Sequence, residues 1–184
     1  ISINPNLADA YYKRGEAYTG LNKPIQAKKD YYKAIELYKS ELSKFPNSAK
    51  LYLDCALAYQ EIIRYDLAIS NFNKAIEIEP EYGFSYFVRS SLYLETKKYL
   101  LAINDYNKII SINPNLAIVY LGRAVCYFEL EKDNLALSDL TKTIELNPKQ
   151  ITAYELRAKL YRATQQNELA ELDELKVQEL KGRQ

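Results

Sequence analysis

The chain contains no histidine, tryptophan or methionine among its 184 residues. Histidine is the commonest metal ligand and general base, so its absence removes the usual centre of metal or acid–base chemistry. The two cysteines, Cys55 and Cys126, suggest neither a disulfide framework nor a metal cluster. The five glycines form no phosphate-binding loop. We therefore expect no catalytic residue, no metal and no cofactor in this segment.

Long hydrophobic runs are also missing, because no stretch of apolar residues is long enough to span a membrane. We find no signal-peptide pattern either, so we expect no membrane insertion and favour the cytoplasm as the compartment. Lysine and arginine number 25 and aspartate and glutamate 24. This balance gives no reason to expect binding to nucleic acid or to an anionic membrane.

The sequence is rich in internal repetition. Proline recurs with a spacing of 34 residues, at positions 46, 80, 114 and 148. Every unit contains two tyrosines seven residues apart, beginning at positions 11, 52, 86, 120 and 154, and a small residue lies four positions after the first tyrosine. An alanine follows further on, with a large residue four positions later in most units. These spacings predict two amphipathic helices in each unit, joined by a short turn and closed by proline.

This order of residues resembles the tetratricopeptide repeat, and the resemblance covers essentially the whole chain. The first aromatic residue of the repeat is usually tryptophan but is tyrosine here, and an arginine often replaces the expected leucine. The resemblance implies an all-α solenoid, in which antiparallel helical hairpins stack into a right-handed superhelix. First helices would line a concave groove and second helices would form the convex back. The expected first helices span residues 7–20, 48–62, 82–96, 116–130 and 150–164, and the expected second helices span 24–44, 66–78, 100–112, 134–146 and 167–181.

We expect residues 1–184 to form a single repeat array. Residues 1–5 would be the tail of a preceding repeat, because residues 1–8 match residues 110–117 letter for letter. The unit of residues 7–46 carries seven extra residues around positions 38–44, which serve either as a tolerated helix extension or as a ledge for a partner. Regular repeats follow at 47–80, 81–114 and 115–148. The last repeat, 149–184, would end in a charged capping helix.

One repeat position holds arginine and another, sixteen residues later, holds aspartate. The arginines are Arg14, Arg89, Arg123 and Arg157, and the aspartates are Asp30, Asp105, Asp139 and Asp173. The second unit has Cys55 and Asn71 at these positions, so both change together. We predict that each arginine forms a bidentate ion pair with its aspartate and holds the two helices of a hairpin in register.

The first helices present an apolar stripe to the expected groove. Its predicted members are Leu53, Leu57, Phe84, Phe87, Val88, Leu94, Ile118, Leu121, Val125 and Phe128, with Glu61, Glu95, Glu129, Lys159 and Arg162 at its rim. We expect Gly122 to leave a dent in this surface. An apolar patch of this kind favours an interaction surface, and packing between neighbouring first helices is the alternative explanation for part of it.

The favoured function is a non-catalytic scaffold that binds an apolar or amphipathic peptide or helix of a protein partner. The alternative is self-association or intramolecular packing within a larger protein, including one with a catalytic domain elsewhere. Two groove chemistries known in the family, a carboxylate clamp and an asparagine ladder, lack their residues here. The balanced charge and the apolar groove also argue against a related class of helical repeats that binds RNA.

Overall fold

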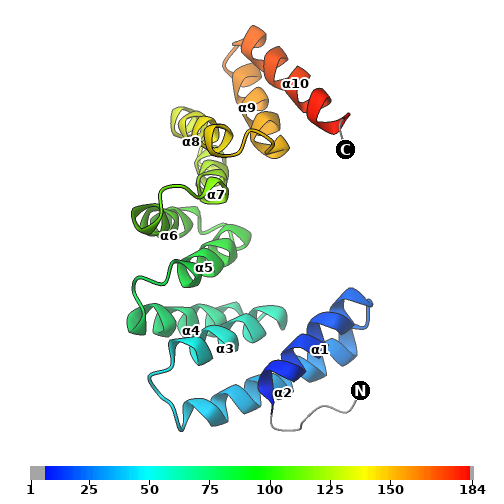
Figure 1. Ribbon diagram of the computed structural model, residues 1–184, viewed down its shortest axis with the longest axis vertical. Coiled ribbons are helices and arrows are strands. Elements are labelled where there is room, and N and C mark those ends of the chain that lie inside the picture. The colour runs from blue at the N-terminus through cyan, green and yellow to red at the C-terminus, as the bar shows by residue number, and fades with distance from the viewer. Residues whose placement is uncertain (1–6, 183–184) are drawn as a thin grey trace. The chain divides into compact units, whose positions relative to one another are not determined.

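The computed structural model describes residues 7–182 and contains helices and turns but no strand in that range. Consecutive helices pair into antiparallel hairpins (Figure 1). The helices are α1 (Ala8–Gly20), α2 (Pro24–Leu42), α3 (Ala49–Glu61), α4 (Tyr65–Ile78), α5 (Gly83–Glu95), α6 (Tyr99–Ile112), α7 (Ala117–Glu129), α8 (Asp133–Leu146), α9 (Ile151–Ala163) and α10 (Asn167–Lys181). The predicted all-α fold is confirmed, and every helix end lies within two residues of the end expected from the sequence.

The chain divides into two compact units, residues 1–85 and 86–184. In the first unit, α2 packs against α3, so the hairpin α1/α2 stacks on α3/α4. In the second unit, α6 packs against α7 and α8 packs against α9. Stacking of neighbouring hairpins is therefore confirmed inside each unit, whereas the single array of residues 1–184 stays a prediction. The expected helical tail at residues 1–5 lies outside the described residues.

The hairpins are held together by large side chains that pack over small ones. Tyr31 on α2 covers Gly15 on α1 so closely that a Cβ atom at position 15 would lie 2.7 Å from Cε1 of the Tyr31 ring. The equivalent small residues of the later hairpins are all buried: Ala56, Ser90, Ala124 and Ala158. Because the helix backbones approach closely at these points, a larger residue there would force them apart.

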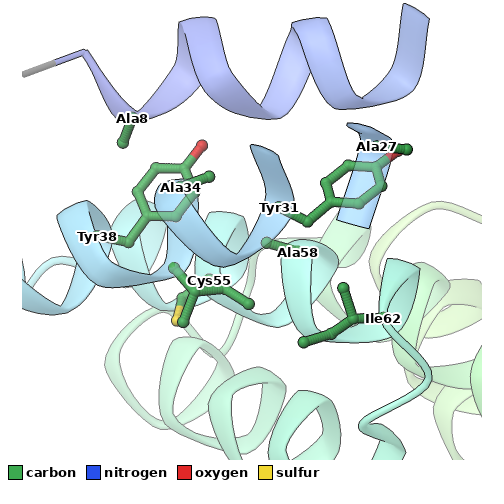
Figure 2. Close-up of a cluster of buried hydrophobic side chains, with 9 residues drawn as sticks. Ala8, Ala27, Tyr31, Ala34, Tyr38, Cys55, Ala58 and Ile62 are labelled. Atoms are coloured by element: carbon green, nitrogen blue, oxygen red, sulfur yellow. The ribbon is translucent and has the colours of Figure 1, made fainter. Parts of the chain in front are cut away.

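The first unit has one core shared by α1, α2 and α3 (Figure 2). Tyr31 and Tyr38 of α2 lie between Ala8 of α1 on one side and Cys55 of α3 on the other. Tyr38 belongs to the seven-residue extension, and its hydroxyl donates a hydrogen bond to Asp9 at 2.8 Å. The extension therefore continues α2 and adds to the core with its first residue instead of only projecting from an edge.

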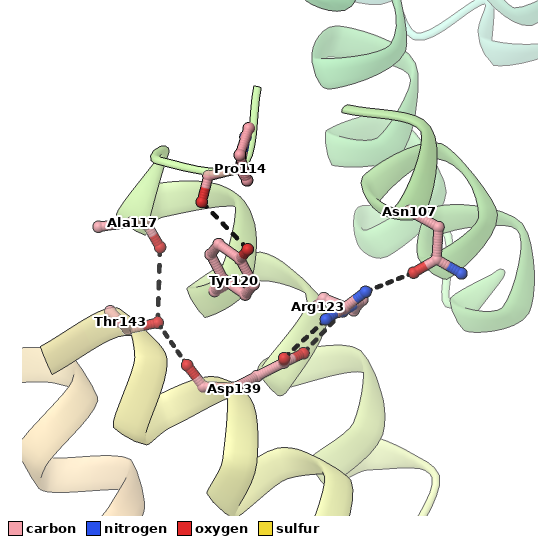
Figure 3. A network of polar contacts seen from close by, with 7 residues as sticks. All are labelled: Asn107, Pro114, Ala117, Tyr120, Arg123, Asp139 and Thr143. Atoms are coloured by element: carbon pink, nitrogen blue, oxygen red, sulfur yellow. Dashed lines mark hydrogen bonds and ion pairs between the residues drawn. The ribbon is translucent and has the colours of Figure 1, made fainter. Parts of the chain in front are cut away.

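The predicted ion pairs are present in four of the five hairpins. In each, the arginine donates Nε and Nη2 to the two carboxylate oxygens of its aspartate; in Arg123–Asp139 both distances are 2.7 Å (Figure 3). The guanidinium also lies between the two tyrosine rings of its own helix, at 5.4–5.9 Å from the ring centroids. Such contacts add cation–π attraction to the ion pair.

Two of these arginines also reach the preceding hairpin. Nη1 of Arg123 donates to Asn107 of α6 at 2.6 Å, and Nη1 of Arg157 donates to Thr141 of α8 at 3.2 Å. In both cases the acceptor lies sixteen residues before the arginine, as the aspartate lies sixteen residues after it. One guanidinium therefore ties together three helices from two hairpins.

The hairpin turns close with one recurring pattern. The N–H of the residue five positions after the second tyrosine donates to that tyrosine's carbonyl, at 2.7–2.9 Å, in all five turns. The residue just before this donor has a left-handed backbone; these residues are Asn22, Ile63, Lys97, Glu131 and Gln165. Glycine is the usual residue at such a helix end, since side chains disfavour positive φ. Ile63, with φ of 60°, is the most strained of the set because it is β-branched.

The ion pair can be tested by a double-mutant cycle on Arg123 and Asp139. Either Arg123→Ala or Asp139→Ala alone should lower the free energy of unfolding by about 2–3 kcal/mol, because the charge left behind loses its partner. Asp139→Ala should cost much less in the Arg123→Ala background. Urea unfolding of the four proteins measures this, with Asn107→Ala as the control that removes only the Nη1 contact. Strictly additive losses would show that the two residues do not act as a pair.

The strained turn predicts that Ile63→Gly stabilises the protein. The side chain is 71% exposed, so little packing is lost, while relief of the left-handed conformation should add about 0.5–1 kcal/mol. Ile63→Val keeps the β-branch and should leave the melting temperature near that of the wild type. Thermal unfolding of both variants checks this, and equal melting temperatures for the two would rule out backbone strain as the cause.

Candidate protein-binding surface

The members of the predicted apolar stripe differ in how much of their surface is exposed. Phe84 at the start of α5 and Ile118 at the start of α7 are 46% and 52% exposed. Leu57, Phe87, Val88, Leu94, Val125 and Phe128 are half-buried. Leu53 and Leu121 are buried. Phe84 belongs to the first unit, so Ile118 is the most exposed member of the stripe in the second unit, where α5 and α7 add half-buried apolar side chains.

Packing against the next hairpin accounts for the buried member Leu121. Leu121 belongs to a core cluster with Leu140 of α8 and Leu160 of α9, and Phe128 packs against the same cluster. These contacts join two neighbouring hairpins inside the second unit. The packing interpretation of the stripe thus applies to Leu121 and to part of Phe128, while Ile118 keeps about half of its surface free.

The dent expected at Gly122 does not exist. A Cβ atom at this position would lie 2.6 Å from Cζ and from the hydroxyl oxygen of Tyr106, so the Tyr106 ring of α6 occupies the space that the missing side chain leaves. Burial raises the pKa of the Tyr106 hydroxyl, and a hydrogen bond with Ser90 opposes that shift. Gly122 therefore permits close packing between α6 and α7 and does not form an anchor site for a ligand.

The predicted rim residues are exposed, and tyrosine side chains lie close to two of the acidic ones. Glu129 accepts a hydrogen bond from the Tyr99 hydroxyl at 3.0 Å. Burial raises the pKa of Tyr31, and the nearby Glu61 carboxylate raises it further. Glu95 is exposed at the end of α5. These carboxylates thus lie at the ends of first helices, with tyrosine hydroxyls close to two of them.

The basic rim residues lie beside an open pocket in the last hairpin. The pocket measures about 740 Å³ and is lined by Glu155, Ala158, Lys159, Arg162, Glu174, Val177 and Gln178. Glu174 stands where earlier hairpins place a large core side chain, and it accepts hydrogen bonds from Nε and Nη2 of Arg162 at 3.2 and 3.0 Å. Replacement of a ring by this ion pair leaves the space above Ala158 open.

The capping helix α10 carries an apolar feature that the sequence analysis missed. Leu169, Leu172 and Leu175 recur every third residue, and the last two are about 60% exposed. The spacing was visible in the sequence, but the many charged residues of this helix obscured it. The end of the second unit is therefore charged and also presents a leucine-lined face.

The described residues offer no obvious catalytic centre. Residues 7–182 contain no cluster of three potential metal-ligating side chains. In the same range, no helix is both long enough and apolar enough to cross a membrane. Cys55 and Cys126 are buried, and burial raises the pKa of both thiols to about 12. Both cysteines are therefore protonated and poor nucleophiles at neutral pH.

The comparisons with known proteins point to one repeat family. A model of the tetratricopeptide repeat matches residues 6–81, and a second model of this repeat matches residues 85–116. The human protein O-mannosyl-transferase TMTC3 is 35% identical over 88 residues, which make up 47% of this chain and 9% of that protein. Its mouse counterpart is 39% identical over 62 residues, or 34% of this chain and 6% of that protein. The chain thus spans less than a tenth of these relatives.

Solved structures share the fold along most of the chain. A crystal structure of MamA has a TM-score of 0.80 at 22% identity and covers 88% of this chain and 94% of that one. MamA from Desulfovibrio magneticus RS-1, from residue 41 to its end, has a TM-score of 0.77 at 17% identity, with 100% and 99% covered. This likeness shows the fold, and the matched repeats show that the chain belongs to the tetratricopeptide repeat family, whose stacked hairpins form protein-interaction modules.

Proposed function

We propose that the chain is a non-catalytic scaffold that binds an apolar or amphipathic peptide or helix of a partner protein on the first helices α5 and α7. The observation that supports this most directly is Ile118, which is 52% exposed although its neighbours on α7 are mostly buried or half-buried. Phe87, Val88 and Leu94 on α5 and Val125 on α7 add half-buried apolar surface. A partner helix would cover this surface with its own apolar residues, which recur at i, i+3, i+4 and i+7 on one face of an amphipathic helix.

The rim gives this surface mixed charge. Glu95 and Glu129 lie at the ends of α5 and α7, while Lys159 and Arg162 lie on α9. A ligand with an apolar face and charged flanks complements such an arrangement, because the apolar centre supplies binding energy and the rim charges orient the ligand. The similarity to TMTC3 covers so little of that transferase that it does not bring a transfer activity to this chain.

A second candidate is self-association, with the leucine face of α10 as its supporting observation. Leu172 and Leu175 are each about 60% exposed on the last helix of the second unit. A second copy, or another segment of a larger protein, could cover this face. In that case the interaction would depend on α10 and not on α5 and α7.

Ile118→Asp separates these two functions. The test uses amphipathic helical peptides selected from a display library against the wild-type protein. These peptides should bind the Ile118→Asp variant about tenfold more weakly than the wild type, because a charge would replace a central apolar contact. Leu100→Asp is the matched control: this leucine is 61% exposed on the second helix α6, and the change should alter affinity less than about twofold. Fluorescence anisotropy gives the affinities after circular dichroism has shown equal helicity.

Unchanged affinity of Ile118→Asp would contradict binding on α5 and α7. If the wild type instead forms dimers that Leu172→Asp dissociates, self-association through α10 would be the better explanation. Analytical ultracentrifugation of the wild type and of both variants distinguishes these results.

A further inference from the structure

The second hairpin keeps two tyrosine rings but lacks the cation that lies between them elsewhere. In the other four hairpins an arginine guanidinium lies within 6 Å of both ring centroids and pairs with an aspartate. The equivalent rings here are Tyr52 and Tyr59, with Cys55 in place of the arginine and Asn71 in place of the aspartate. A cysteine side chain ends several atoms short of a guanidinium, so the position is left unfilled.

A pocket lies at this position. It measures about 340 Å³ and is lined by Lys39, Leu42, Ser43, Tyr52, Cys55, Tyr59 and Asn71, which we call the Cys55 pocket. Lys39, Leu42 and Ser43 come from the seven-residue extension of α2. The two departures of this chain from a regular repeat, the extension and the lost ion pair, therefore meet in one place.

The extension replaces an acceptor with a cation. Lys39 lies sixteen residues before Cys55, as Asn107 and Thr141 lie sixteen residues before the arginines whose hydrogen bonds they accept. The fourth and fifth hairpins thus have the order acceptor, cation, anion across three helices. The second hairpin has a cation, an unfilled position and a neutral amide.

The charge of the Cys55 pocket favours an anion. Lys39 is the one charged residue among the described residues that line it. The Cys55 thiol is protonated because burial raises its pKa to about 12, so the thiol supplies no negative charge. Residues 24–44 as a whole carry five lysines and two glutamates besides Asp30, which is paired with Arg14. A bound arginine would meet Lys39 without any carboxylate, whereas a carboxylate would meet a complementary charge.

We propose that the Cys55 pocket binds a glutamate side chain from an acidic segment of a partner protein. The aliphatic stem of the glutamate would pack between the Tyr52 and Tyr59 rings, above the Cys55 thiol. Its carboxylate would accept hydrogen bonds from Nζ of Lys39. Asn71 is held by a hydrogen bond from its Nδ2 to the Leu67 carbonyl at 2.8 Å and forms a fixed polar end of the pocket. This site lies within the first unit and includes no residue of α5 or α7, so it is independent of the function proposed above.

The test measures binding of a fluorescein-labelled hexaglutamate peptide to the whole chain by fluorescence anisotropy at low salt. Lys39→Gln removes the charge from the Cys55 pocket. The double variant Cys55→Arg/Asn71→Asp fills the pocket with the pair that the other hairpins contain, so its fold should be kept. Lys29→Gln is the matched control, because it removes one charge from the same helix without lining the pocket.

We expect Lys39→Gln and the double variant each to weaken hexaglutamate binding about fivefold or more, and Lys29→Gln to change it less than about twofold. Equal weakening by Lys29→Gln and Lys39→Gln would overturn the proposal, since the peptide would then respond only to the general charge of α2. Absence of hexaglutamate binding by the wild type would overturn it as well. Tighter binding of hexaarginine or of a uridine oligonucleotide would assign the pocket to a different class of ligand and would also contradict it.

Discussion

The structure depends on the close approach of two helix backbones within each hairpin. Gly15, Ala56, Ser90, Ala124 and Ala158 are small and buried, and at Gly15 even one methyl group would collide with the facing ring of Tyr31. The large partner must therefore come from the second helix, which fixes the register of the pair. Gly122 shows the same arrangement between hairpins, where Tyr106 of α6 fills the space beside α7. A large side chain over a small one thus joins the two helices of a hairpin and also joins one hairpin to the next.

The ion pairs add a second constraint to this packing. Each guanidinium gives up water for one carboxylate and two tyrosine rings, and burial raises the pKa of Asp105 despite its arginine partner. Such a pair stabilises little in net terms but penalises any structure that separates its members. Its main contribution is therefore specificity of register. The second hairpin lacks the pair and still forms, because its core contacts at Ala56 and Phe72 are fully buried.

Much of the fold could be predicted because its markers recur at one period. Proline, the paired tyrosines and the small residues placed all helix ends within two residues, and the joint loss at Cys55 and Asn71 revealed the ion pair. The candidate surface was harder to predict, since a first-helix side chain can face either a ligand or the next hairpin. Leu121 is buried against the next hairpin, and Tyr106 covers Gly122. These outcomes depend on contacts between neighbouring hairpins, which the repeat pattern of a single unit does not contain.

The arginines that reach the preceding hairpin have a consequence for cooperativity. Arg123 and Arg157 link adjacent hairpins in the second unit through Asn107 and Thr141, and in a repeat array such nearest-neighbour links determine how far unfolding of one unit spreads to the next. At the junction of α2 and α3 the corresponding position is Cys55, which makes no such link. The polar coupling between repeats is therefore uneven along the chain, and the first two hairpins are coupled instead through the apolar core that α1, α2 and α3 share.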